Sequence, residues 1–208
     1  GIIRQAGIIK DAAKLAVNEL GGKKSADVAV RTDRDITMKT ILTIIIATLV
    51  ATLVFFQFGV LGNWLQTIVA LLIVFVIAFL FTTVAANAIA IVGSNPVSGM
   101  TLMTLILASV VMVAVGLKGP GGMVAALVMG GVVCTALSMA GGFITDLKIG
   151  YWLGTTPANQ ETWKFLGTLV SAATVGGVMI VLNKTYGFTS GELAAPQANA
   201  MAAVIKPL

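Results

Sequence analysis

The chain contains no histidine, a single cysteine and few charged residues, and each shortage excludes a class of function. Without histidine, it lacks the commonest metal ligand and the commonest general base. Cys134 lies alone in an apolar stretch, so it has no intrachain disulfide partner and is predicted to be a packing residue. No nucleophile stands next to a base, and no carboxylates pair within the apolar sequence. The composition therefore predicts a protein that is not an enzyme and has no metal site or cofactor.

Charge is absent from one long tract, Thr40–Leu117, which runs for 78 residues without Asp, Glu, Lys or Arg. The whole chain of 208 residues is 58% hydrophobic and 10% charged, whereas soluble chains carry about 25% charged residues. A helix that crosses a bilayer needs roughly 20 mostly apolar residues. The sequence therefore predicts an all-α membrane protein with five transmembrane helices, at about Met38–Phe58, Trp64–Val92, Met100–Val115, Met123–Phe143 and Trp163–Leu182.

The N-terminal part has a different composition, and we expect residues 1–35 to form a cytoplasmic segment before a transmembrane domain at 36–208. Residues 2–20 place apolar side chains on one helical face and charged ones on the other. This pattern predicts an amphipathic helix that lies along the membrane surface or docks on another part of the protein. Residues 21–35 are polar and are expected to form a solvated connector. The segment has no base-reading groups, so nucleic acid is not an expected partner.

The distribution of basic residues predicts the orientation in the membrane. Eight of the thirteen Lys and Arg residues lie within residues 1–40, and short cytoplasmic segments are enriched in these residues. With residues 1–40 inside, alternation of the helices puts Lys148 and Lys164 inside, and Lys118, Lys184 and Lys206 outside. Ten basic residues then lie inside and three outside. The sequence predicts a multi-pass membrane protein whose N-terminal segment is cytoplasmic.

Gly93–Thr101 is a polar, Gly- and Pro-containing insert within the apolar tract. Pro96 lacks a backbone donor and disfavours helix at Asn95, and a bilayer has no water to satisfy free backbone groups. Two interpretations fit this pattern. The insert is a plain loop with Ser94 or Asn95 as a helix cap, or it is a break in a helix whose free backbone groups bind a substrate, as in secondary transporters.

A second polar insert covers residues 144–161. Asp146 and Lys148 are the only charged residues between Lys118 and Glu161, and at i and i+2 they do not face each other on a helix. The insert is either a solvated cytoplasmic loop or a gate at the inner mouth of a transport pathway.

Small residues recur every four positions in Gly122–Ser138, which predicts a seam for close helix packing. Such a seam, together with an amphipathic helix, also suits a small membrane scaffold or anchor subunit of a larger complex. We keep this function as the alternative to transport.

The two inserts carry motifs that resemble a known family. The first reads Ser94-Asn95-Pro96-Val97-Ser98-Gly99-Met100-Thr101, and the second reads Asp146-Leu147-Lys148-x-Gly150-Tyr151-x-x-Gly154-x-Thr156-Pro157-x-x-Gln160. Together with Arg31–Lys39 and Ala195-Pro196-Gln197-Ala198, they resemble the oligopeptide transporter family, which includes the yellow-stripe-like carriers of metal chelates. The resemblance is to a fragment from the latter half of a bacterial member.

The resemblance implies a symporter, a secondary active transporter whose expected substrates are short peptides or peptide-like metal chelates. It also implies proton coupling, a location in the bacterial cytoplasmic membrane, and the remainder of the transporter chain as a partner. The residues expected along the substrate path are Asn87, Asn95, Pro96, Ser98, Gly99 and Thr101. The residues expected to act in a cytoplasmic gate or in coupling are Asp146, Lys148, Gly150, Tyr151, Thr156, Pro157 and Gln160.

Overall fold

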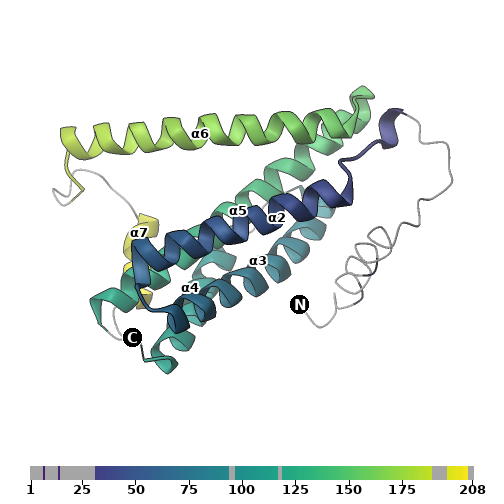
Figure 1. Ribbon diagram of the computed structural model, residues 1–208. Coiled ribbons are helices and arrows are strands. Elements are labelled where there is room, and N and C mark those ends of the chain that lie inside the picture. Colours follow the sequence, from purple (N-terminus) through teal and green to yellow (C-terminus); the bar gives the residue numbers. More distant parts are fainter. Residues whose placement is uncertain are drawn as a thin grey trace.

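The computed structural model describes Gly7, Lys14 and residues 31–93, 97–116, 119–188 and 196–205. Every regular element in these ranges is helical (Figure 1), which confirms the predicted all-α class. The elements are η2 (Arg31–Asp33), α2 (Met38–Phe55), η3 (Phe56–Leu61), α3 (Trp64–Val92), α4 (Val97–Ala114), α5 (Pro120–Leu153), α6 (Pro157–Thr185) and α7 (Pro196–Ile205). The predicted amphipathic helix at 2–20 lies outside the described residues, apart from Gly7 and Lys14, which are helical.

Four helices are long and apolar enough to cross a membrane, namely α2 continued by η3, α3, α5 and α6. The fifth predicted span corresponds to α4, whose apolar part, Gly99–Ala114, is shorter. The second span begins and ends where the sequence predicts, at Trp64 and Val92. The five apolar helices therefore stand at the predicted places in the chain.

The packed core is formed by α3, α4 and α5. Their buried side chains recur every three or four residues, for example Ile77, Phe81 and Ala85 on α3, so each helix turns one face inward. Gly130 of α5 lets α4 approach closely, because a Cβ at this position would lie 2.5 Å from Leu105 Cδ2. The small-residue seam is thus a packing contact at its centre, while Ser138 at its end is exposed.

The other two long helices lie at the periphery. Neither α2 nor α6 has a buried residue, and Figure 1 shows α6 lying apart from α3 and α4 along one side of the molecule. The described part of the chain therefore leaves most of the α6 surface uncovered.

The connection between the first two spans is shorter than predicted. The spans predicted at Met38–Phe58 and Trp64–Val92 leave residues 59–63 as their connection, but helical structure continues as a π-helix to Leu61. The buried Gln57 stabilises this extension: its Nε2 donates to the carbonyl of Gly62 (3.1 Å), and Thr67 Oγ1 donates to its Oε1 (2.8 Å). Gly62 then takes a left-handed conformation (φ 69°), which glycine adopts without a steric penalty.

A solvated loop over residues 144–161 is not present, and that interpretation is wrong. α5 continues without a break through Asp146 and Lys148 to Leu153, and α6 begins at Pro157. The polar side chains of this segment are compatible with a helix, because they extend from its surface and find partners on neighbouring elements. Only Gly154–Thr156 leaves the helical conformation, and this break positions the candidate site described next.

Candidate functional site

A tight elbow joins α5 to α6. Gly154 ends α5 in the left-handed conformation (φ 67°), and the N–H of Thr155 donates to the carbonyl of Gly150 (2.9 Å), as is common at glycine-terminated helices. Thr156 is extended, and Pro157 occupies the first turn of α6, where its missing N–H removes no helical hydrogen bond. Gly154, Thr156 and Pro157 therefore reverse the chain within three residues.

Gly150 and Gln160 meet across this elbow. Gly150 is buried, and a Cβ at its position would collide with the amide end of the Gln160 side chain. Glycine is thus required here because a side chain from α6 lies directly against the backbone of α5. By contrast, Tyr151 points outward and keeps 79% of its surface exposed.

The segment before α2 is bound to the elbow by hydrogen bonds. Arg31 Nη2 donates to the carbonyl of Gly154 (2.9 Å), and the N–H of Ile36 donates to Glu161 Oε2 (3.0 Å). The N–H of Ala158 donates to the carbonyl of Arg34 (2.9 Å). These bonds satisfy backbone groups that the end of α5 and the start of α6 leave without helical partners. The predicted solvated connector therefore ends in a segment that is attached to α5 and α6.

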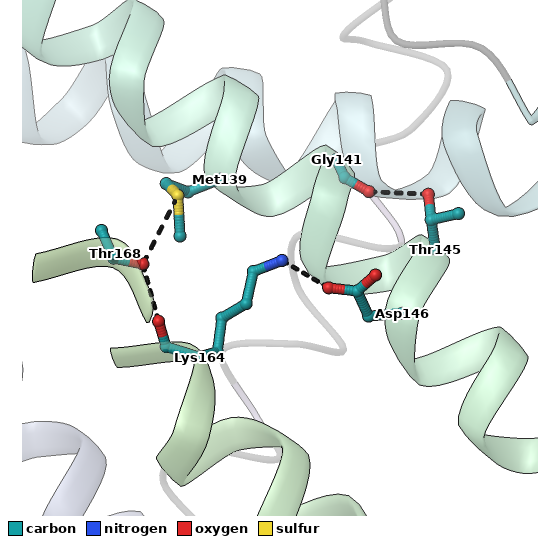
Figure 2. Close-up of polar contacts among 6 residues, drawn as sticks. All are labelled: Met139, Gly141, Thr145, Asp146, Lys164 and Thr168. Carbon is teal, nitrogen blue, oxygen red and sulfur yellow. Dashed lines mark hydrogen bonds and ion pairs between the residues drawn. The ribbon is translucent and has the colours of Figure 1, made fainter. Parts of the chain in front are cut away.

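An ion pair joins α5 to α6 further from the elbow. Lys164 Nζ on α6 contacts Asp146 Oδ2 on α5, as Figure 2 shows. The Lys164 side chain crosses the backbone of Gly142, where a Cβ would lie 3.4 Å from Nζ. The side chains are 30% and 51% exposed for Lys164 and Asp146, respectively, so the described part of the chain does not enclose either charge.

Next to the pair, Thr168 Oγ1 of α6 lies 3.8 Å from Met139 Sδ and 2.8 Å from the carbonyl oxygen of Lys164 (Figure 2). Thr145 on α5 donates to the carbonyl of Gly141 at 2.9 Å. Of these contacts, only the one between Thr168 and Met139 joins α6 to α5, while the other two lie within a single helix.

A groove with a volume of about 390 Å³ opens between these two helices. Its size lies within the range of small-molecule sites, roughly 300–1,000 Å³. We call it the α5–α6 groove, and it is lined by Phe143, Asp146, Leu147, Ile149, Gln160, Trp163, Lys164 and Gly167.

Lys148 connects this region to the first polar insert. Its Nζ lies 3.5 Å from the carbonyl oxygen of Ala90, near the end of α3. Asp146 and Lys148 thus turn toward different helices, as their i, i+2 spacing requires. The contact brings the second insert beside the last turn of α3, which ends at Gly93 in a left-handed conformation (φ 76°).

The sequence matches one protein family over residues 2–208, the family described as OPT oligopeptide transporter protein. The chain belongs to this family. The OPT chain is also 27% identical over 212 residues to a protein of Haemophilus influenzae that is named as an oligopeptide transporter. This alignment covers 88% of the OPT chain and 33% of the relative, so the chain spans about a third of its relative's length. No solved structure matches.

Membership confirms the resemblance carried by the two inserts, and it makes the OPT chain part of a multi-pass membrane protein in a transporter family, not an enzyme. In the described ranges, no group of three His, Cys, Asp or Glu side chains is placed to hold a metal ion.

The residues predicted for the substrate path are described only in part. Asn95 and Pro96 lie outside the described residues, and Ser98 is described as a helical residue of α4 but not in its side chain. Thr101 is buried on α4, and Asn87 is half-buried on α3, while Gly99 is exposed. A path through these residues, with either a loop or a broken helix at the first insert, stays a prediction.

The residues predicted for a cytoplasmic gate or for coupling all lie in the described ranges, and most of them gather at the elbow, while their role stays a prediction. Gly150, Thr156, Pro157 and Gln160 form its structure, Asp146 binds α6, and Lys148 reaches α3. Lys164 was missed as a site residue, because it entered the sequence analysis only as a positive charge. A signal existed: Asp146 and Lys164 each lie nine positions from Thr155, and residues equidistant from a turn face each other in a hairpin of two helices.

Proposed function

We propose that the OPT chain forms part of a secondary active transporter that carries short peptides, or peptide-like metal chelates, in symport with protons. The observation that carries this proposal is the family match over residues 2–208. The name of the H. influenzae relative supports a peptide substrate. Asp146 and Glu161, the carboxylates nearest the elbow on α5 and α6, are candidates to carry the coupled proton.

The test is uptake by the full-length protein in proteoliposomes. A labelled library of short peptides and a set of metal chelates are supplied with and without an inward pH gradient, at clamped membrane potential. We expect uptake of at least one class, accelerated by the gradient and abolished by a protonophore. Uptake of neither class, compared with empty liposomes, would refute transport and favour the scaffold function. Uptake at the same rate with and without the pH gradient would refute proton coupling but not transport.

We also propose that the elbow end of the helices faces the cytoplasm of a bacterial cell. In the described ranges this end carries Arg31, Arg34, Lys39, Lys148 and Lys164, whereas Lys184 lies near the far end of α6. Basic residues accumulate on the cytoplasmic side of membrane helices.

Cysteine labelling tests this orientation. In a full-length background freed of all cysteines, Cys134→Ser included, Tyr151→Cys places a thiol at the exposed surface of the elbow, and Asn183→Cys places one at the opposite end of α6. A membrane-impermeant maleimide added to intact cells should label Asn183→Cys but not Tyr151→Cys. After the cells are permeabilised, it should label both. The reverse pattern would invert the topology.

A further inference from the structure

The α5–α6 groove holds one negative and one positive side chain on opposite walls. We propose that these two charges bind the two ends of a zwitterionic short peptide, with Asp146 receiving the terminal ammonium and Lys164 the terminal carboxylate. The inference rests on the proposed transport function and assigns a substrate site within it. The ion pair seen in Figure 2 is then the resting arrangement that a peptide replaces.

The exposure of the pair makes this exchange possible. Both side chains are partly open to solvent, and exposed ion pairs add little to stability, so their separation costs the protein little. The peptide supplies an opposite charge to each partner as the two separate. Neither the carboxylate nor the ammonium is then left unpaired.

The flexibility of Lys164 accommodates the length of a peptide. An extended residue spans about 3.3–3.6 Å, so the two charges must move apart to hold the ends of even a dipeptide. Lysine has a flexible four-carbon chain. Gly142 has no side chain, and apart from its chain neighbours and the backbone of its own helix, the atom within 4 Å of a Cβ built there is Lys164 Nζ. The ammonium can therefore swing along this part of α5 without meeting a side chain at position 142.

The rest of the groove suits a peptide of variable sequence. Phe143, Leu147 and Trp163 offer apolar surface to side chains, and the amide of Gln160 has both a donor and an acceptor for a peptide backbone. The neighbouring cavity, at Ile36, Ile44, Glu161 and Phe165, suits it less well. Its one charged side chain, Glu161, already accepts a hydrogen bond from the backbone of Ile36.

The experiment compares four forms of one tripeptide, Ala-Ala-Ala: unmodified, N-acetylated, C-amidated and modified at both ends. Uptake is measured with the full-length protein in proteoliposomes. Loss of a charge-assisted hydrogen bond lowers affinity by about tenfold or more. Each modified peptide should therefore compete for uptake of the unmodified peptide less strongly by that factor. This comparison uses the unaltered protein and does not depend on the folding of any variant.

Two variants then assign each end to its residue. Asp146→Asn should lose discrimination against the N-acetylated peptide and keep discrimination against the amidated one, and Lys164→Gln should show the converse. Lys39→Gln is the matched control, since this exposed lysine lies on α2 near the same end of the bundle but does not line the groove.

The possible failures are distinguishable. If the unaltered protein takes up all four forms equally, the two-ended site is refuted and peptide transport stands. If both variants lower the counterflow of every form in equal proportion, measured without a pH gradient so that proton coupling plays no part, the pair only fastens α6 to α5 and the proposal fails. If no form enters while other peptides or chelates do, the two-ended site is refuted and transport stands; if nothing in the broader library enters, the site and transport are refuted together.

Discussion

The packing of α4 against α5 can be tested with a pair of single substitutions at adjacent glycines. Gly130 and Gly131 are neighbours on α5 with opposite surroundings. A Cβ at Gly130 would lie 2.5 Å from Cδ2 of the buried Leu105, whereas a Cβ at Gly131 would meet nothing within 4 Å. Both positions lie in the interior of the same helix. The two Gly→Ala variants therefore differ in packing but not in helix propensity.

The expected magnitudes follow from these surroundings. Gly131→Ala should stabilise the protein by about 0.5–1 kcal/mol, because alanine loses less conformational entropy than glycine when the helix forms. Gly130→Ala has the same gain, but it adds a methyl group to a packed interface, which costs roughly 1–3 kcal/mol. Since the propensity gain cancels in the comparison, Gly130→Ala should be less stable than Gly131→Ala by that packing cost.

Unfolding of the full-length protein in detergent micelles, followed by tryptophan fluorescence during denaturant titration, measures this difference. A double variant, Gly130→Ala with Leu105→Ala, sharpens the test. Leu105→Ala alone should cost about 2–5 kcal/mol, and the new methyl group should recover part of this loss, with a coupling of about 0.5–3 kcal/mol. Equal stabilities for the Gly130 and Gly131 variants, or strict additivity in the double variant, would refute the close approach of α4 to α5.

Three further predictions concern the elbow and the first insert. Glu161→Gln should speed hydrogen exchange at the amide of Ile36, because a neutral acceptor holds this N–H less firmly than a carboxylate; unchanged exchange, measured by mass spectrometry, would show that the contact is absent in solution. Gly150→Ala should displace the Gln160 side chain and lower peptide uptake in proteoliposomes. Uptake equal to that of the unaltered protein would show that this packing at the elbow is not needed for transport. Asn95→Ala and Ser98→Ala, alone and together, should reduce uptake if the first insert lines the substrate path, and unchanged uptake by all three variants would remove it from that path.

The helices of this protein could be predicted from sequence because apolar length decides them. Thr40–Leu117 has no charge to interrupt a span, and Asn63 and Gly93 mark the ends of α3 with ordinary capping chemistry. The π-helix at Phe56–Leu61 was not predictable in this way. It depends on the buried hydrogen bonds between Gln57 and Thr67, two residues that come together only after the chain has turned.

The candidate site, like the fold, could be predicted from the sequence only in part. The motif around Gly150 and Gln160 marked the segment that forms the elbow, but composition suggested a loop where α5 continues as a helix. Asp146 was compared with Lys148, its neighbour in sequence, whereas its partner is Lys164 on the next helix. The pairing depends on the place where the chain reverses, and a polar segment does not reveal that place until Gly154 and Pro157 are recognised as the two helix ends.

The elbow gives α6 a mechanical property. From Leu169 to Thr185 the helix has no buried residue, while its first turns are fastened through Glu161, Lys164 and Thr168. A helix of 29 residues is about 43 Å long at 1.5 Å per residue. A rotation of about 10° at a hinge of this kind would carry the far end through roughly 7 Å. Because the chain joins α6 to α5 through the short elbow at Gly154–Thr156, a small change of angle there would displace the far end of α6 much more than its first turns.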